Sequence, residues 1–127
     1  MEIDTLEAGA ELDWLVLHHV FDWKRGISAF GEAPYRHGPV AHQALLPVST
    51  DLADAWRVLE HAIARGLRVT LQSVTDHSPQ TWGVTLASPA GGSAYAWGET
   101  VPVAICRAAL RAVEAALLVK SSGDTLN

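Results

Sequence analysis

Apolar and polar residues alternate in three short runs between positions 67 and 98, and this pattern constrains the fold more than any other. In LRVTLQS (67–73) every second residue is apolar, which is the spacing of a half-buried strand. TWGVTLA (81–87) alternates in the same way, and SAYAWG (93–98) supplies a short third strand. Because only short turns join the three runs, we predict an antiparallel meander.

Apolar residues at helical spacing predict three helices around these strands. The first spans about residues 5–23 and the second about 50–65. The third begins near Thr100, with Pro102 in its first turn, where a missing N–H costs nothing. Trp56 falls on the apolar stripe of the second helix and is interpreted as its anchor in the core.

The element order α-α-β-β-β-α predicts an α+β fold with helices packed on a three-stranded antiparallel sheet. We expect a single domain over residues 1–127 with a frayed tail at 120–127. Residues 26–48 have neither period and contain three prolines and three glycines. Such a length without regular structure is uncommon in a compact domain, so the segment is either a functional loop or a mobile insertion.

Several side chains in and beside this loop are candidates for binding a ligand. Those within the loop that can stack or donate hydrogen bonds are Phe30, Tyr35, Arg36, His37 and His42. Trp23 closes the first helix and Trp97 closes the last strand. At such an edge a tryptophan either caps the core or offers a stacking surface to a planar ligand.

Composition excludes several classes of function. The net charge of −5 argues against binding long nucleic acids, which requires a basic surface. One cysteine, Cys106, cannot form an internal disulfide and suggests a reducing compartment. The acidic N-terminus lacks the pattern of a signal peptide, and no apolar stretch approaches the length of a membrane span. We therefore expect a cytosolic protein that does not contact membranes.

The sequence predicts no metal, cofactor or catalytic group. The six histidines lack the spacing of a metal site, and one cysteine cannot build a structural zinc centre. No nucleophile elbow, P-loop or dinucleotide fingerprint is present. Cys106, among apolar neighbours, is interpreted as a buried small hydrophobe.

The second helix begins with three consecutive capping residues, Ser49, Thr50 and Asp51, although a helix needs one N-cap side chain. We expect Asp51 to pair with Arg107 or with a backbone N–H, and Ser49 and Thr50 to contact a ligand. Arg107 lies near the start of the last helix, where its charge opposes the helix dipole. Either a carboxylate such as Asp51 or an anionic ligand is expected to offset it.

Four stretches together resemble a known family: AGAELDWLVLHHVFDW, PVSTDLADAWRVLEH, WGVTL and ETVPVAICRAALRAV. In this order, over about residues 8–114, they are similar to the phage alpha-beta-alpha (ABA) sandwich domain of small phage and prophage proteins. The chain departs from the family pattern at Phe21–Asp22 and at Val48. The resemblance implies a three-layer αβα sandwich, whereas the polar second face of the first strand favours two layers. Both hold if that face is partly covered, or is covered by another subunit.

The resemblance implies a phage accessory protein but no firm activity. Our leading hypothesis is a non-enzymatic oligomer that binds and sequesters a nucleotide-like immune signal of the host. A protein–protein adaptor or inhibitor is the alternative, and an enzyme acting on a nucleotide comes third. The residues expected to bind the ligand are Trp23, Tyr35, Arg36, His37, Ser49, Thr50, Asp51, Trp97 and Arg107.

Overall fold

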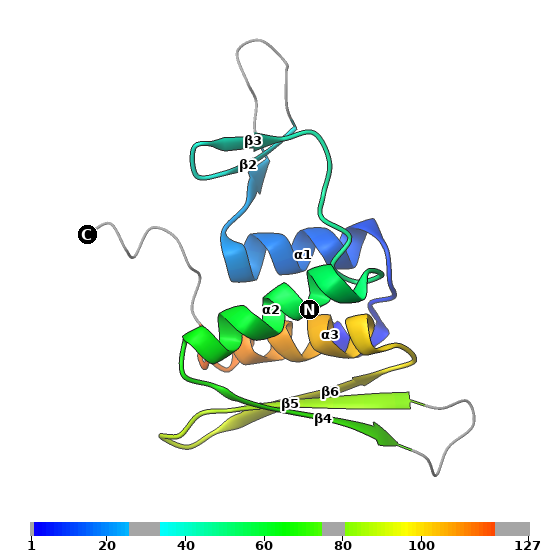
Figure 1. The fold of residues 1–127 in the computed structure, drawn as a ribbon, viewed down its shortest axis with the longest axis vertical. Helices are drawn as coiled ribbons and strands as arrows, with labels where there is room; N and C mark the ends of the chain where they lie inside the picture. Colours follow the sequence, from blue (N-terminus) through cyan, green and yellow to red (C-terminus); the bar gives the residue numbers. More distant parts are fainter. Residues whose placement is uncertain (1, 26–33, 75–80, 119–127) are drawn as a thin grey trace.

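The computed structural model describes residues 2–25, 34–74 and 81–118. The elements are η1 (Ile3–Thr5), α1 (Ala10–Phe21), β1 (Lys24–Arg25), β2 (Tyr35–His37), β3 (Val40–His42), α2 (Leu52–Ala64), β4 (Arg68–Val74), β5 (Thr81–Ala87), β6 (Ser93–Gly98) and α3 (Val101–Glu114). The predicted α+β class is confirmed: three helices lie between a large and a small antiparallel sheet (Figure 1). The expected tail at 120–127 lies outside the described residues.

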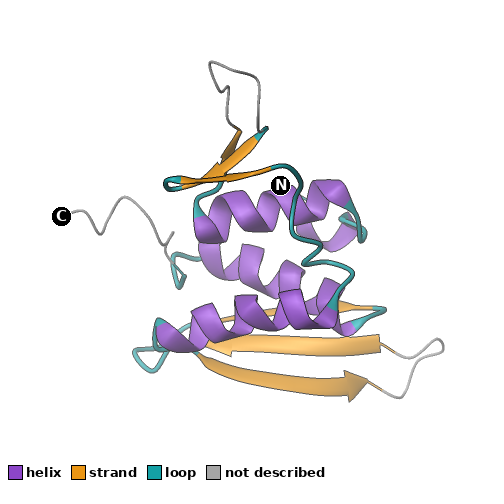
Figure 2. Cartoon of the chain, turned by 45° about the horizontal axis from the view of Figure 1, so that its top comes forward, coloured by secondary structure: helices purple, strands orange, loops and turns teal. Residues whose placement is uncertain are grey.

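The predicted meander forms the large sheet, in the order β4–β5–β6. Its inner face is apolar because alternate residues of β6, Ala94 and Ala96, are buried, while Tyr95 and Trp97 point to the open face. The helix α3 packs against β5 and β6 on the inner face, and α1 and α2 pack on α3 (Figure 2). Every residue from Pro102 to Leu110 is buried, so α3 is the central element of the core.

The small sheet corrects the expectation that residues 26–48 lack regular structure. Within that range, β2 and β3 form a hairpin, and β1 pairs with β2 (Figure 1). These strands have two or three residues each, which is too short for a period to be recognised in the sequence. Residues 26–33 lie outside the described part of the chain.

The first helix ends earlier than the sequence predicted. It stops at Phe21 because Asp22 adopts a left-handed conformation with φ of 60°. The N–H of Trp23 then donates to the Leu17 carbonyl at 3.0 Å and that of Asp22 to the His18 carbonyl at 3.1 Å, so these bonds close the end of the helix. Asp22 thus ends the helix, and Trp23 lies beyond it.

The interpretation of Trp56 as a core anchor is wrong, because its side chain is 47% exposed. The buried side of α2 consists of Ala55, Val58, Leu59 and Ala62, which face α3. Leu52 and Ile63, which are spaced from Trp56 by four and seven residues along the same side of the helix, are also exposed. The apolar arc of α2 is therefore wider than the contact with α3, and part of it faces solvent.

Among the residues that the structure describes, no helix is long and apolar enough to cross a membrane. The same part of the chain contains no group of three or more side chains arranged to hold a metal ion.

Candidate ligand-binding site

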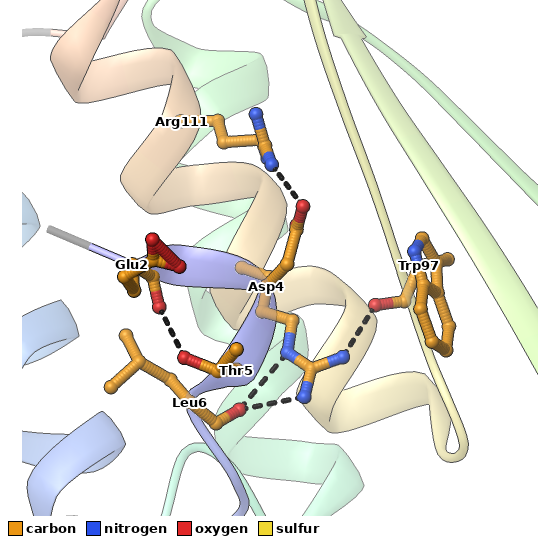
Figure 3. Close-up of polar contacts among 7 residues, drawn as sticks. Glu2, Asp4, Thr5, Leu6, Trp97 and Arg111 are labelled. Atoms are coloured by element: carbon orange, nitrogen blue, oxygen red, sulfur yellow. Dashed lines mark hydrogen bonds and ion pairs between the residues drawn. The ribbon is translucent and has the colours of Figure 1, made fainter.

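Arg107 belongs to the interior of the protein. Its side chain is 3% exposed, and its Nε and Nη2 donate to the Leu6 carbonyl at 3.0 and 2.7 Å. Its Nη1 donates to the Trp97 carbonyl at 2.9 Å, and the guanidinium lies 5.7 Å from the centroid of the Trp97 ring. Figure 3 shows these two carbonyls on either side of the guanidinium. Backbone oxygens therefore occupy the place where we expected a carboxylate or an anionic ligand.

Ser49 is also internal, with no exposed surface. Its hydroxyl donates to Asp13 Oδ1 at 2.6 Å and accepts from the Gly9 N–H at 2.9 Å, while its own N–H donates to the same Asp13 oxygen at 2.8 Å. This network joins the start of α1 to the segment before α2. We therefore leave Ser49 out of the candidate site.

The other two capping residues behave differently from each other. Asp51 is the N-cap of α2 and accepts from the Asp54 N–H at 3.0 Å, which is one of the two partners expected for it. Thr50 is exposed, and its hydroxyl donates to the Pro47 carbonyl at 3.4 Å. Neither side chain belongs to the pocket described below.

Cys106 lies in the core, where its thiol donates to the Val48 carbonyl at 3.4 Å. Burial, followed by the nearby Asp13 carboxylate, raises the pKa of this thiol far above its ordinary value. The thiolate needed for nucleophilic attack is thus disfavoured, as expected for a buried small hydrophobe.

Trp23 is held rigidly at the junction of α1 and the small sheet. Its N–H is bound in the helix cap, and its carbonyl lies 2.7 Å from Nδ1 of His18. Its ring is buried and stacks with His42 at 4.2 Å between centroids and an angle of 20°. His37 lies 6.0 Å from the same ring at 18°, so that two imidazoles are nearly parallel to one indole.

The alternation of the small sheet decides which of its side chains reach this cluster. Tyr35 and His37 are half-buried and lie near Trp23, with ring centroids at 6.5 and 6.0 Å. Arg36, between them, is exposed and lies on the opposite face of the strand, beside Lys24 of β1. The structure therefore brings Tyr35 and His37 together with Trp23 but turns Arg36 away.

A pocket of about 210 Å³ opens beside Trp23, between α1, the hairpin and the first turns of α2. Its residues are Leu17, Phe21, Trp23, His37, His42, Leu46, Val48, Asp54 and Arg57. This lining combines apolar side chains, two imidazoles and a charged rim formed by Asp54 and the exposed Arg57 of α2. At that rim Arg57 Nε lies 3.7 Å from Asp54 Oδ1, and the Arg57 side chain is 67% exposed.

Trp14 of α1 makes further aromatic and cationic contacts close to the Trp23 cluster. The Trp14 ring stacks with His18 at 5.0 Å and lies 5.8 Å from Tyr35. The guanidinium of Arg25 lies 4.7 Å from the centroid of the Trp14 ring, within the range of a cation–π interaction. Two arginines therefore lie among these aromatic residues, Arg25 over Trp14 and Arg57 at the pocket.

A larger, open hollow of about 650 Å³ lies near the N-terminus, but three glutamates line it: Glu2, Glu7 and Glu11. Their charge disfavours an anionic ligand there. We therefore take the smaller pocket beside Trp23 as the candidate site.

The sequence identified part of this site. Trp23, Tyr35 and His37 are together, whereas Trp97 lies in the large sheet, which the helices separate from the small one (Figure 1). Arg57 was missed, although it stands in the second turn of the helix whose N-terminus was singled out. One sequence feature could have pointed to Arg57: its helix begins directly after the unpatterned loop, so the first turns of the helix lie close to that loop.

Comparison with known proteins agrees with this fold. A profile of the phage ABA sandwich domain matches residues 14–110, which is most of the chain. The chain therefore belongs to the phage ABA sandwich domain family and is a small phage protein. No significant match was found among curated proteins or among solved structures.

Proposed function

We propose that this phage protein binds a small nucleotide-like immune signal of the host and sequesters it without changing it chemically. The observation that carries the proposal is the pocket beside Trp23, which combines parallel aromatic rings with an exposed arginine. Planar bases stack on such rings, and phosphates pair with arginine. The residues that form it come from three separate segments of the chain, so the folded protein is needed to assemble it.

The size of the pocket limits how much of a ligand it can enclose. About 210 Å³ is smaller than the roughly 300–1,000 Å³ typical of pockets that enclose a drug-sized molecule. One base fits this description, with the sugar and phosphates remaining outside. Trp23 is buried and its ring is nearly parallel to those of His37 and His42, so these half-buried imidazoles would form the contact surface and Trp23 would hold them in place.

Phosphates outside the pocket would meet Arg57 at the rim. Its present partner, Asp54, is a side-chain carboxylate at 3.7 Å, and surface pairs of this kind contribute about 0–1 kcal/mol. A phosphate can therefore displace this pair at little cost. Arg25, beside Trp14, is the second cation on the same aromatic surface.

The test is to purify the protein from cells with active defence signalling and to measure its mass under native conditions. We expect a retained small molecule that is released intact on heating. With the pure protein, cyclic dinucleotides and cyclic ADP-ribose isomers form the panel for thermal-shift measurements. No retained mass and no thermal shift with any member would contradict the proposal, and a chemically altered molecule would favour an enzyme.

Two arginine variants provide a matched control. Arg57→Gln removes the cation at the rim and is expected to weaken binding at least tenfold. Arg36→Gln removes another exposed cation, on the opposite face of the small sheet, and should leave binding unchanged. Equal losses in both variants would point to a general attraction between charges instead of this pocket.

A specific observation favours an adaptor as the second candidate function. The open face of the large sheet carries Tyr95 and Trp97, which are 44% and 42% exposed. The Tyr95 ring lies over Gly83, where an added Cβ would be 2.6 Å from the Tyr95 hydroxyl. A flat aromatic surface of this kind suits a protein partner. A single stoichiometric partner recovered from host lysate by wild type, and lost by Tyr95→Ser, would support the adaptor.

A further inference from the structure

We propose that the pocket beside Trp23 selects a guanine base and that Asp54 makes this choice. The oxygens of the Asp54 carboxylate accept hydrogen bonds from N1–H and N2–H of guanine, while the base lies against the imidazoles of His37 and His42. This inference rests on the proposed function and deepens it, because it names the class of nucleotide that the pocket takes.

Asp54 has a distinct chemical place in the lining of the pocket. Among the described residues, it contributes the one carboxylate of this lining, and its side chain is 19% exposed. Most of the other lining side chains are apolar, such as Leu46 and Val48. An ionised carboxylate accepts hydrogen bonds and donates none. It therefore lowers the affinity for an anionic ligand unless that ligand presents N–H donors to it.

The Asp54 carboxylate is not needed to begin the helix α2. Asp51 provides the N-cap oxygen, which accepts from the Asp54 N–H at 3.0 Å. The Asp51 N–H donates to the Pro47 carbonyl at 2.8 Å, so this carbonyl takes the place of the reciprocal bond of a capping box. In the described part of the chain, the partner of the Asp54 carboxylate is Arg57, whose Nε lies 3.7 Å from Oδ1, beyond the ordinary length of a hydrogen bond.

A phosphate bound at Arg57 changes what Asp54 requires. Arg57 then pairs with the phosphate, and the Asp54 carboxylate loses its cation while most of its surface is shielded from water. A charged group in this state is costly unless hydrogen-bond donors replace the cation. The base is the part of the ligand that lies in the pocket, so the base has to supply these donors.

Guanine is the base whose donors match a carboxylate. On its Watson–Crick edge N1–H and N2–H are adjacent, so that each meets one carboxylate oxygen in charge-assisted hydrogen bonds. Adenine offers the donor N6–H beside the acceptor N1, and N1 repels the second oxygen. Cytosine and uracil likewise place an acceptor beside each donor. We therefore expect guanine to bind about tenfold more tightly than adenine.

Calorimetric titration with three cyclic dinucleotides tests the choice of base. Cyclic di-GMP, cyclic di-AMP and cyclic di-IMP share one sugar–phosphate ring and differ in the base. We expect cyclic di-GMP to bind about tenfold more tightly than cyclic di-AMP. Cyclic di-IMP should lie between them, because hypoxanthine keeps N1–H and lacks the 2-amino group. Equal affinities for cyclic di-GMP and cyclic di-AMP would overturn the inference.

Asp54→Asn and Asp51→Asn form a matched pair of variants, because each removes one carboxylate from the start of α2. Asn presents a donor beside an acceptor, which matches N1 and N6–H of adenine, so Asp54→Asn should reverse the preference toward cyclic di-AMP. Asp51→Asn keeps an N-cap side chain outside the pocket and should keep the preference for cyclic di-GMP. If Asp54→Asn weakens binding of both ligands equally, Asp54 acts by holding Arg57 and does not select the base.

The outcomes separate this inference from the proposed function. Preferential binding of adenine ligands that is lost in Arg57→Gln would overturn the choice of guanine and leave the proposed function standing. No binding of any cyclic dinucleotide or cyclic ADP-ribose isomer would overturn both.

Discussion

Two groups of polar residues differ in what their hydrogen bonds are used for. Arg107 and Ser49 are buried, and the polar atoms of both side chains bind backbone or side-chain groups of other segments. The residues around Trp23 lie at the surface, and there the imidazoles and Arg57 border a pocket. A polar residue in an unusual sequence context therefore does not by itself indicate a ligand, because the fold can require the same residue to join its parts.

Substitution of Arg107 should give the largest loss of stability. Arg107→Met removes three hydrogen bonds and leaves two carbonyls, those of Leu6 and Trp97, without this partner. Unfulfilled buried polar groups cost about 1–3 kcal/mol each, so we expect the free energy of unfolding in urea to fall by about 3 kcal/mol. The affinity for the proposed ligand should not change in the folded fraction.

Arg111 provides the control for Arg107, because it stands one turn further along the same helix. Its Nη2 pairs with Asp4 Oδ2 at 2.6 Å, but the two side chains are 38% and 48% exposed (Figure 3). Exposed pairs contribute about 0–1 kcal/mol, so Arg111→Met should cost much less than Arg107→Met. Equal costs would show that the carbonyl contacts of Arg107 do not stabilise the fold.

Ser49 and Thr50 are neighbours in the chain, but Ser49 is buried and joins two segments, whereas Thr50 is exposed at the surface. Ser49→Ala removes the hydroxyl between Asp13 and Gly9, and we expect a loss of about 2 kcal/mol in unfolding free energy. Thr50→Ala changes an exposed side chain and should cost less than about 0.5 kcal/mol. If Thr50→Ala instead proves as costly as Ser49→Ala, burial is not what distinguishes them.

His42 should show the opposite pattern, with a small effect on stability and a large effect on binding. His42→Ala removes one aromatic pair with Trp23, and such pairs are worth about 0.5–1.5 kcal/mol beyond their buried area. We expect a cost of about 1 kcal/mol by urea denaturation, together with loss of the thermal shift produced by the ligand. Retention of the full thermal shift would exclude this imidazole from the binding surface.

The sequence predicted the large sheet and the helices because their periods extend over whole segments. Apolar and polar residues alternate in the runs between 67 and 98, and these runs form strands. Apolar residues between 101 and 114 recur at helical spacing, and this segment forms a helix. The small sheet was not predictable in this way, since two or three residues contain no period. Trp56 was misplaced because a helical stripe shows which residues are apolar but not how wide the contact with the neighbouring helix is.

The candidate site was predictable only in part for a related reason. Trp23, Tyr35 and His37 were identified from residue type and position at the edges of elements. Their association with Arg57 depends on how α1, the hairpin and α2 meet around one pocket, which brings together residues distant in the chain. The sequence showed correctly that the charge of Arg107 opposes the helix dipole, but it could not show what offsets that charge. The carbonyls of Leu6 and Trp97, which do so, come from segments that no local sequence pattern connects to Arg107.

The smallest effect that we expect is the pH dependence of stability caused by His61, a histidine outside the pocket. Burial, followed by the charge of Arg65, lowers its pKa below the usual 6.5, and its ring lies 4.9 Å from that of Phe21. As the pH falls through 6.5, the unfolded chain therefore takes up the proton before the folded chain does. The stabilisation from neutral His61 is present above pH 6.5 and is lost as the pH falls toward the lower pKa of the folded state. Urea denaturation from pH 7.5 to 5 should show a smaller loss of stability in His61→Gln than in wild type, and parallel curves would show that His61 titrates alike in both states.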